Sequence, residues 1–187
     1  MKVAAFAVAL IGGVLSTAAQ ANLITNGNFM TGDFSGWTLT TIDPNDANYI
    51  YAPGTGGAFL GPVSDAFLSQ SFATVAGDTY QVSFRLSNPS AAAGTQFSAF
   101  FNTDSLYSVK DTAVSPTTFT FDAVATGSTS KLTFGFKNIP DYFNLSRVSV
   151  SPVPEPEAYV MMLGGLALLG GIVGFKRRSN TDFGMGA

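Results

Sequence analysis

Carboxylates are the residues of this chain that could do acid-base chemistry, because the sequence contains no histidine and no cysteine. Without those two residue types, neither a Ser-His-Asp nor a Cys-His relay can be assembled, and a zinc site built on imidazole or thiolate ligands is excluded. A pair of carboxylates stays open as a hydrolytic arrangement, although no glutamate precedes Glu155. The acids that could form such a pair are Asp33, Asp65, Asp78, Asp104, Asp111, Asp122 and Asp141. Most of them lie at the ends of expected strands, where turns use aspartate. We therefore predict no catalytic residues and keep a polysaccharide-active enzyme as the alternative.

Oxygen ligands for a metal ion are concentrated in one short run, residues 43–48, which reads Asp-Pro-Asn-Asp-Ala-Asn. Calcium binds several hard oxygens, including carboxylates. The spacing resembles a calcium loop only in part, and aspartate, asparagine and proline are also the ordinary residues of turns. We expect a turn here, and we predict neither a metal site nor a cofactor.

Aromatic side chains are the candidates for binding a ligand without catalysis. Trp37 is the only tryptophan and could stack on a sugar ring, although large aromatic residues dominate protein cores and we favour a core position for it. Tyr49 and Tyr51 are expected at strand ends and are the further candidate glycan contacts, and Tyr107 and Tyr142 are placed similarly. The sequence therefore offers aromatic stacking as the chemistry of any binding site.

The charge distribution argues against nucleic acid as a partner. The formal net charge is −3, and the basic residues in the middle of the chain are scattered as Arg85, Lys110, Lys131, Lys137 and Arg147. Binding to phosphates requires clustered lysine and arginine. We therefore exclude a nucleic-acid-binding protein.

The C-terminal part has three segments in a fixed order. Residues 152–157 are a proline-rich linker that contains Val153, Pro154, Glu155 and Pro156. The apolar run 158–175 follows, and as a helix its 18 residues would reach about 27 Å, close to the thickness of a bilayer's hydrocarbon core. The basic cluster Lys176, Arg177 and Arg178 begins the segment 176–187. Because basic residues stay on the cytoplasmic side, we predict one transmembrane helix with the N-terminus outside and 176–187 as a cytoplasmic anchor and tail.

The N-terminal residues 1–21 are predicted to be a signal peptide. Lys2 gives the positive start, an apolar segment follows, and Ala19 and Ala21 form a small-x-small cleavage site. The alternative is an N-terminal membrane anchor, but the apolar segment is shorter than a membrane span. The mature chain is therefore expected to start at Asn22.

Residues 22–151 are predicted to form one all-β domain. In 79–87, apolar and polar residues alternate, as on a half-buried strand, and 117–123 and 131–137 repeat this pattern with Phe119 and Phe121 pointing inward. The turn-rich residues 126–130 suggest a hairpin between those two segments. Further strands are expected at 37–42, 48–51, 67–74, 96–102, 106–109 and 143–150. Turn residues separate them at the spacing of sandwiches, and no apolar run is spaced for a helix of useful length, so we predict an antiparallel, jelly-roll-like β-sandwich.

The C-terminal part resembles the PEP-CTERM sorting signal of exported bacterial proteins, since Val153-Pro154-Glu155-Pro156 precedes a glycine-rich apolar run and Lys176-Arg177-Arg178. The resemblance implies that the protein is a substrate of exosortase, a membrane protease, in a Gram-negative bacterium that makes exopolysaccharide. It also implies that cleavage occurs near the Pro-Glu-Pro motif, so that the protein leaves the inner membrane for the cell envelope or the extracellular space.

The domain resembles galactose-binding-like carbohydrate-binding modules in its opening residues 22–29 and 31–37, in 70–84 and in its closing residues 147–150. Many such modules hold a structural calcium between acids that would correspond here to Met30 and Ser146. A thioether gives calcium no ligand, so the resemblance does not extend to a calcium site.

Together these features predict an exported, non-catalytic protein of the cell envelope or extracellular matrix that is associated with exopolysaccharide or binds glycan weakly. The alternatives are the polysaccharide-active envelope enzyme and an adhesin-like structural protein without a ligand.

Overall fold

The computed structural model describes residues 21–90, 92–138 and 140–154 of the 187-residue chain. Within these ranges, no helix is long and apolar enough to cross a membrane. Several predictions lie outside the described residues: the signal peptide with Ala19, the motif residues Glu155 and Pro156, the apolar span 158–175, and the basic cluster Lys176, Arg177 and Arg178.

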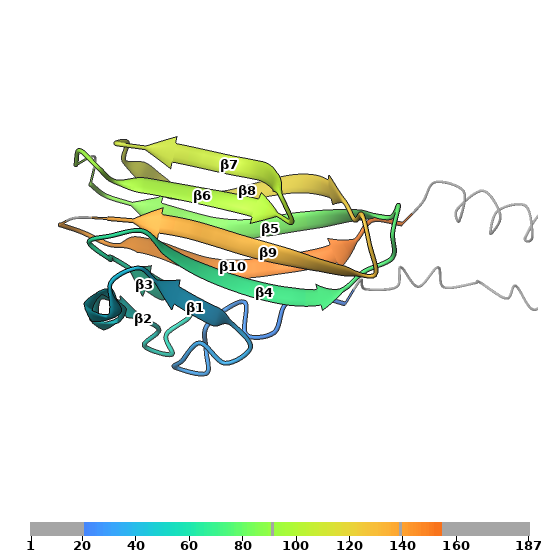
Figure 1. Ribbon diagram of the computed structural model, residues 1–187, viewed down its shortest axis with the longest axis horizontal. Helices are drawn as coiled ribbons and strands as arrows, with labels where there is room; N and C mark the ends of the chain where they lie inside the picture. Colours follow the sequence, from blue (N-terminus) through green and yellow to red (C-terminus); the bar gives the residue numbers. More distant parts are fainter. Residues whose placement is uncertain (1–20, 91, 139, 155–187) are drawn as a thin grey trace, which may run out of the picture.

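The described residues form ten strands in two five-stranded antiparallel sheets, with one short 3-10 helix, η1 (Pro44–Tyr49) (Figure 1). We call the sheet with the order β1-β4-β9-β6-β7 sheet A and the sheet with the order β2-β3-β10-β5-β8 sheet B. The strands of sheet A are β1 (Thr38–Thr41), β4 (Ala66–Ala73), β9 (Thr129–Lys137), β6 (Gln96–Phe101) and β7 (Asp104–Lys110). The strands of sheet B are β2 (Ile50–Tyr51), β3 (Ala58–Leu60), β10 (Phe143–Pro152), β5 (Thr79–Asn88) and β8 (Val114–Val124).

The strand order is that of a jelly roll. Leaving out the edge strands β1 and β2, the orders β4-β9-β6-β7 and β3-β10-β5-β8 are the two four-stranded sheets of that fold. The predicted antiparallel, jelly-roll-like sandwich is therefore confirmed.

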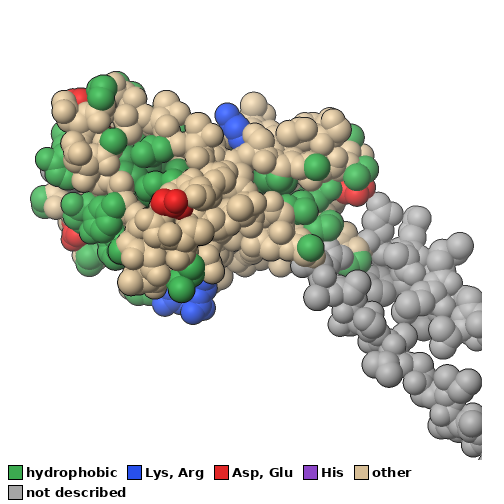
Figure 2. Space-filling view, turned by 90° about the horizontal axis from the view of Figure 1, so that it is seen from below, with side chains coloured by type: hydrophobic (Ala, Val, Ile, Leu, Met, Phe, Trp, Pro, Cys, Tyr) green, Lys and Arg blue, Asp and Glu red, His purple; other side chains and the backbone are tan. Residues whose placement is uncertain are grey.

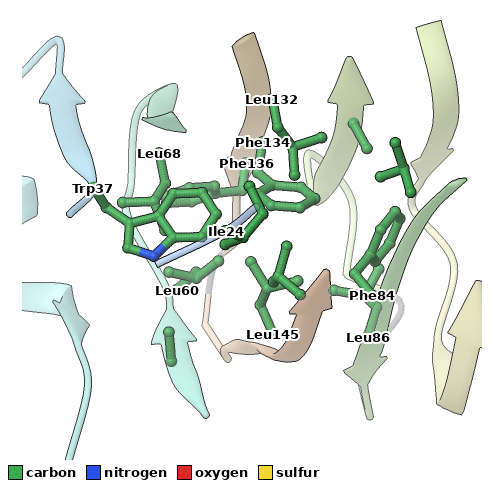
Figure 3. Packing of buried hydrophobic residues seen from close by; sticks show 14 of the residues in the cluster. Ile24, Trp37, Leu60, Leu68, Phe84, Leu86, Leu132, Phe134, Phe136 and Leu145 are labelled. Atoms are coloured by element: carbon green, nitrogen blue, oxygen red, sulfur yellow. The ribbon is translucent and has the colours of Figure 1, made fainter. Parts of the chain in front are cut away.

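The core lies between the two sheets and is built by residues that alternate along each strand. In β4, Ala66, Leu68, Gln70 and Phe72 are buried while the residues between them are more exposed. Figure 3 shows Leu68 and Phe134 of sheet A with Leu60, Phe84 and Leu145 of sheet B in this layer. Seven phenylalanines are fully buried: Phe29, Phe84, Phe97, Phe101, Phe134, Phe136 and Phe143. Each sheet consequently has one face in this aromatic core and one outer face.

Three details of the predicted strands are wrong. Residues 126–130 do not close a hairpin, because β8 pairs with β5 in sheet B while β9 pairs with β4 and β6 in sheet A, and the turn crosses between the sheets. Residues 48–51 are a strand only at Ile50–Tyr51, since η1 takes up the preceding residues. The three-residue strand β3 was not expected, because it is too short for an alternating pattern to show.

Both ends of the domain lie at the same end of the sandwich (Figure 1). The Leu23 amide donates to the Val150 carbonyl at 2.8 Å, and the Val153 amide donates to the Thr79 carbonyl at 2.8 Å. Strand β10 also continues through Pro152, so the sheet includes the first residue of the predicted linker. We call this end the exit end and the opposite one, where β10 starts at Phe143, the far end.

Candidate functional site

The outer face of sheet A carries one flat aromatic surface near the far end. Phe67 of β4 is 40% exposed and lies beside Gly135 of β9 in the ladder. A Cβ at Gly135 would lie 3.1 Å from Cε1 and 3.3 Å from Cδ1 of Phe67, so the phenyl ring covers the glycine. Because the glycine has no side chain, the ring can lie against the backbone of β9 and leave its other side free. We call Phe67 on Gly135 the Phe67 platform.

Polar side chains surround the Phe67 platform. Ser98 of β6 lies opposite Gly135 in the ladder, and its hydroxyl donates to the Gly135 carbonyl at 3.3 Å. In the next row toward the far end, Gln96 lies between Lys137 and Lys110. The Gln96 side-chain amide donates to the Asp65 carboxylate at 2.6 Å. The platform is thus an apolar ring bordered by a hydroxyl, an amide and charged groups.

The outer face of sheet B carries a second aromatic group at the far end, formed by Tyr51, Phe59 and Tyr142. The rings of Tyr51 and Phe59 stack with centroids 5.2 Å apart and planes inclined by 14°. The Tyr142 ring lies edge-on to both, at 5.7 Å and 74° from Tyr51 and at 6.3 Å and 81° from Phe59. We call these three residues the aromatic corner.

A glycine also lies beneath the aromatic corner. A Cβ at Gly61 would lie 2.6 Å from Cδ1 and 2.7 Å from Cε1 of Tyr142, so the Tyr142 ring covers Gly61. Along the ladder, Tyr51 is opposite Phe59, Phe59 is opposite Asn144, and Asn144 is opposite Ser87. The corner therefore continues across the sheet into an amide and a hydroxyl.

The tryptophan predicted as a core residue or a glycan contact is a core residue. Trp37 is only 8% exposed, stacks on Phe29 with centroids 5.7 Å apart, and lies 6.0 Å from the Phe134 ring. Its indole N–H donates to the Asn26 carbonyl at 3.3 Å. Figure 3 shows the indole among the core side chains. As both faces of the sandwich lie outside this layer, Trp37 offers no surface to a sugar, and the glycan-contact interpretation of Trp37 is wrong.

The predicted tyrosines are distributed differently. Tyr49, on η1, and Tyr51, in the aromatic corner, are 45% and 44% exposed. Tyr107 instead turns inward at the edge of the sandwich, where its ring lies 4.4 Å from that of Phe119. Burial there raises the pKa of Tyr107. The structure therefore brings together Tyr51 and Tyr142 but not Tyr49 or Tyr107.

Residues 43–48 were expected to form a turn, and in the structure they cap and form most of the short 3-10 helix η1. Asp43 caps η1 by accepting the Asn45 amide at 2.9 Å. Asp46 is buried and accepts the amides of Val63 and Ser64 at 2.8 and 2.9 Å together with the Ser64 hydroxyl. Burial opposes the ionisation of Asp46, but these hydrogen bonds and the charge of Lys137 lower its pKa below the ordinary value of 3.8. Asp43 is therefore bound within its own turn, whereas Asp46 ties η1 to the loop just before β4.

Other acids are also used locally. Asp33 accepts hydrogen bonds from Thr31 and Ser35, which lower its pKa, while Asp111 accepts the Gly94 amide and Asp141 accepts the Tyr142 amide. Within residues 21–90, 92–138 and 140–154, no group of three or more acids is arranged to hold a metal ion. These contacts fit caps and turns rather than a reacting pair.

A comparison with protein families identifies the segment that follows the sandwich. Residues 152–178 match the PEP-CTERM protein-sorting motif. The match begins at the last residue of β10 and includes the predicted motif residues and basic cluster. This motif implies an exported protein of the cell envelope that exosortase recognises, and it confirms the resemblance seen in the sequence. A search of curated protein sequences finds no match.

Solved structures similar to the sandwich include three carbohydrate-binding modules. A structure of TmCBM61 in complex with β-1,4-galactotriose has a TM-score of 0.53 and 15% identity over 71% of this chain and 99% of that chain. A CBM4 structure has a TM-score of 0.51 and 17% identity over 70% and 99% of the two chains. A family 16 carbohydrate-binding module has a TM-score of 0.50 and 17% identity over 69% and 99%. The sandwich therefore has the fold of carbohydrate-binding modules.

Larger solved chains contain a similar portion. This chain spans 21% of the enzymatically active domain of bacteriophage CBA120 tailspike protein 4, with a TM-score of 0.49.

Neither glycine-backed ring was singled out from the sequence. Phe67 was expected on a strand, but nothing in the sequence showed that Gly135 lies beside it, because that pairing joins residues far apart in the chain. Tyr142 was named among several tyrosines, and Phe59 lies in the strand that was not expected.

Proposed function

We propose that this protein is a non-catalytic glycan-binding protein that exosortase sorts to the cell envelope or extracellular matrix, and that its sandwich binds glycan weakly on the outer face of sheet A. The Phe67 platform is the observation that carries the proposal, since a flat, exposed ring backed by Gly135 matches the apolar face of a pyranose. The match to the sorting motif supports export of the protein.

Polar groups around Phe67 suit the hydroxyls of a sugar. Binding sites for small molecules combine an apolar surface with a few placed polar groups. Here Ser98, Gln96 and Lys137 occupy the outer face of neighbouring strands, and the long β-ladder between β4, β9 and β6 holds them in register. One ring and a few hydrogen bonds correspond to roughly −4 to −5 kcal/mol, which is a dissociation constant on the order of millimolar. We therefore expect one site to bind a single sugar weakly, so that binding to a polysaccharide depends on its repeated sugars.

The sorting steps follow from the order of segments in the sequence. The signal peptide directs export, and the apolar run 158–175 holds the protein in the inner membrane with its N-terminus outside. An exosortase-type protease then cuts near residues 153–156 and releases the sandwich to the envelope or the medium. Exopolysaccharide outside the cell is the glycan we propose for it.

Glycan binding is tested with the mature protein purified from the medium. Wild-type protein and a Phe67→Ala variant are applied to a glycan array and to exopolysaccharide from the producing cells. We expect wild-type binding and a loss of about threefold to tenfold in the variant. Val75→Ala is the matched control, because Val75 is 60% exposed at the exit end. No binding by the wild-type protein would favour the adhesin-like protein without a ligand, and turnover of the polysaccharides would favour the enzyme.

Sorting is tested separately with the double substitution Pro154→Ala and Glu155→Ala. We expect this variant to stay in the inner-membrane fraction while the wild-type protein reaches the medium. If the variant appears in the medium at the wild-type rate, residues 153–156 are not the sorting element.

A further inference from the structure

The two aromatic surfaces lie on opposite faces of the same end of the sandwich. Phe59 and Phe67 belong to the consecutive strands β3 and β4, one in each sheet. Their neighbours Leu60 and Leu68 are fully buried and both belong to the core between the sheets (Figure 3). Since side chains alternate along a strand, Phe59 must point out of sheet B and Phe67 out of sheet A. The aromatic corner and the Phe67 platform therefore face away from each other.

We propose that the aromatic corner is a second carbohydrate-binding site, so that one domain bridges two polysaccharide chains. This inference rests on the proposed function of the Phe67 platform. Paired sheets are about 10 Å apart, and side chains extend outward from both, so the two surfaces are roughly 20 Å apart. One extended glycan cannot lie on both faces at once.

The shape of the corner suits a sugar ring. Tyr142 covers Gly61, and the Tyr51 and Phe59 rings are inclined to it by 74° and 81°. The three rings thus form a floor and a side wall, with Tyr51 44% exposed. A pyranose has an apolar face for one ring and a hydroxyl-bearing edge for polar neighbours.

Polar, uncharged side chains continue the row of the corner, and the Asp141 carboxylate, which accepts the Tyr142 amide, lies beside it. Asn144 and Ser87 continue the row that begins with Tyr51 and Phe59. The Asn144 amide lies against Gly57, since a Cβ there would be 3.0 Å from its nitrogen and 3.2 Å from its oxygen. The amide and the hydroxyl are donors and acceptors for sugar hydroxyls.

The size of the corner favours a sugar over a second copy of the protein. A whole aromatic side chain presents about 150–250 Å², and the three rings of the corner are covered in part by each other. The free apolar area is then on the order of 200–300 Å², whereas a stable protein interface needs roughly 800 Å² from each partner. One or two sugar rings fill the available surface.

The position of the corner also leaves it free. The chain leaves the sandwich at the exit end, where Val153 is bonded to Thr79. The corner is at the far end, next to the start of β10 at Phe143. Figure 2 shows a broad group of hydrophobic side chains at its left side, which is the far end. A second polysaccharide chain can therefore approach the corner without meeting the membrane linker.

The bridging test uses the mature protein as it is secreted, together with exopolysaccharide purified from the producing cells. Solution viscosity reports bridging, and equilibrium dialysis against fragments of the same polysaccharide reports the number of sites. We expect wild-type protein to raise the viscosity and to bind two fragments per molecule. Tyr51→Ala with Tyr142→Ala should bind one fragment and lose the rise in viscosity. Phe67→Ala, which weakens its site about threefold to tenfold, should bind fewer fragments than the wild type at the same concentration and reduce the rise in viscosity.

Controls separate the possible failures. Thermal unfolding shows whether the double variant is folded. If it is not folded, the single exposed substitution Tyr51→Ser takes its place and is expected to weaken the second site about threefold to tenfold. If the corner variants bridge like the wild type, the second site is wrong while the Phe67 platform stands. If the wild type binds no fragment, the proposed function itself fails. If light scattering shows that the wild type is a dimer and the corner variants are monomers, the corner is a protein interface and the inference is overturned.

Discussion

The two outer faces of the sandwich use the same device with different support. On sheet A, the Phe67 ring of the eight-residue strand β4 covers Gly135 of the nine-residue strand β9. On sheet B, the Tyr142 ring covers Gly61, but Tyr51 and Phe59 lie on strands of two and three residues. A long ladder fixes the platform, whereas the corner depends on short edge strands and loops. The difference suggests a rigid site on one face and a more adaptable one on the other.

The largest expected effect comes from the core that both faces share. Phe134 is fully buried and lies 5.2 Å from the Phe84 ring of the opposite sheet. Phe134→Ala should lower the free energy of unfolding by about 3 to 5 kcal/mol, because it leaves a cavity between the sheets. Urea denaturation measures this loss, and glycan binding should fall on both faces together. A loss of binding on one face alone would show that the faces are not supported by one core.

The two glycines distinguish the faces directly. A Cβ at Gly61 would lie 2.9 Å from the backbone carbonyl oxygen of Asp141 as well as against Tyr142, so Gly61→Ala should cost about 1 to 3 kcal/mol. A Cβ at Gly135 would meet the side chains of Ser98 and Phe67, which can move, so Gly135→Ala should cost less than about 1 kcal/mol.

Thermal unfolding and binding assays compare the two glycine variants. Gly135→Ala should tilt the Phe67 ring and weaken glycan binding with little loss of stability. Equal losses of stability in both variants would contradict the difference drawn between the two faces.

Asp46 connects the two faces, because it ties together the segments that lead into β2 of sheet B and β4 of sheet A. It holds Val63 and Ser64 just before β4, while η1 leads into β2 and Tyr51. The pKa of Asp46 is below 3.8 in the folded protein, so its stabilising effect is present above that value and is lost as the pH falls through the folded pKa.

Asp46→Asn tests this connection. At pH 7 the variant should be less stable by about 1 to 3 kcal/mol, because an amide cannot accept every hydrogen bond of the carboxylate. The difference between wild type and variant should shrink as the pH falls from 3.8 through the lower pKa of the folded protein, where the wild-type carboxyl becomes protonated too. Urea midpoints at pH 6 and pH 2.5 measure it, and an unchanged difference at the two pH values would disprove the role of the ionised form.

Much of the sandwich could be predicted from the sequence, because its strands alternate strictly and its turns are rich in glycine, asparagine and aspartate. The strand at 79–87 is an example, since Tyr80, Val82, Phe84 and Leu86 are all buried. The connection at 126–130 failed because local turn signals do not reveal which sheet the next strand joins. The core position favoured for Trp37 was confirmed for the physical reason given, namely the size of its apolar ring.

The surface sites were less predictable, because they depend on pairings between distant strands. Tyr51 could be named from its type and position, but its stacking on Phe59 requires the short strand β3. Phe67 stands out only when Gly135, 68 residues later in the chain, is placed beside it. The sorting motif was the easiest to find, since its three segments are contiguous in sequence.

The most direct test of the glycan-binding proposal is a titration of the secreted protein with exopolysaccharide fragments, followed by amide NMR. The account predicts the largest shifts at Phe67, Gly135 and Ser98 and, for the second site, at Tyr51, Phe59 and Tyr142, with the signals of Val75 and Val124 at the exit end unchanged. Shifts confined to the exit end, or no shifts at millimolar fragment, would contradict it.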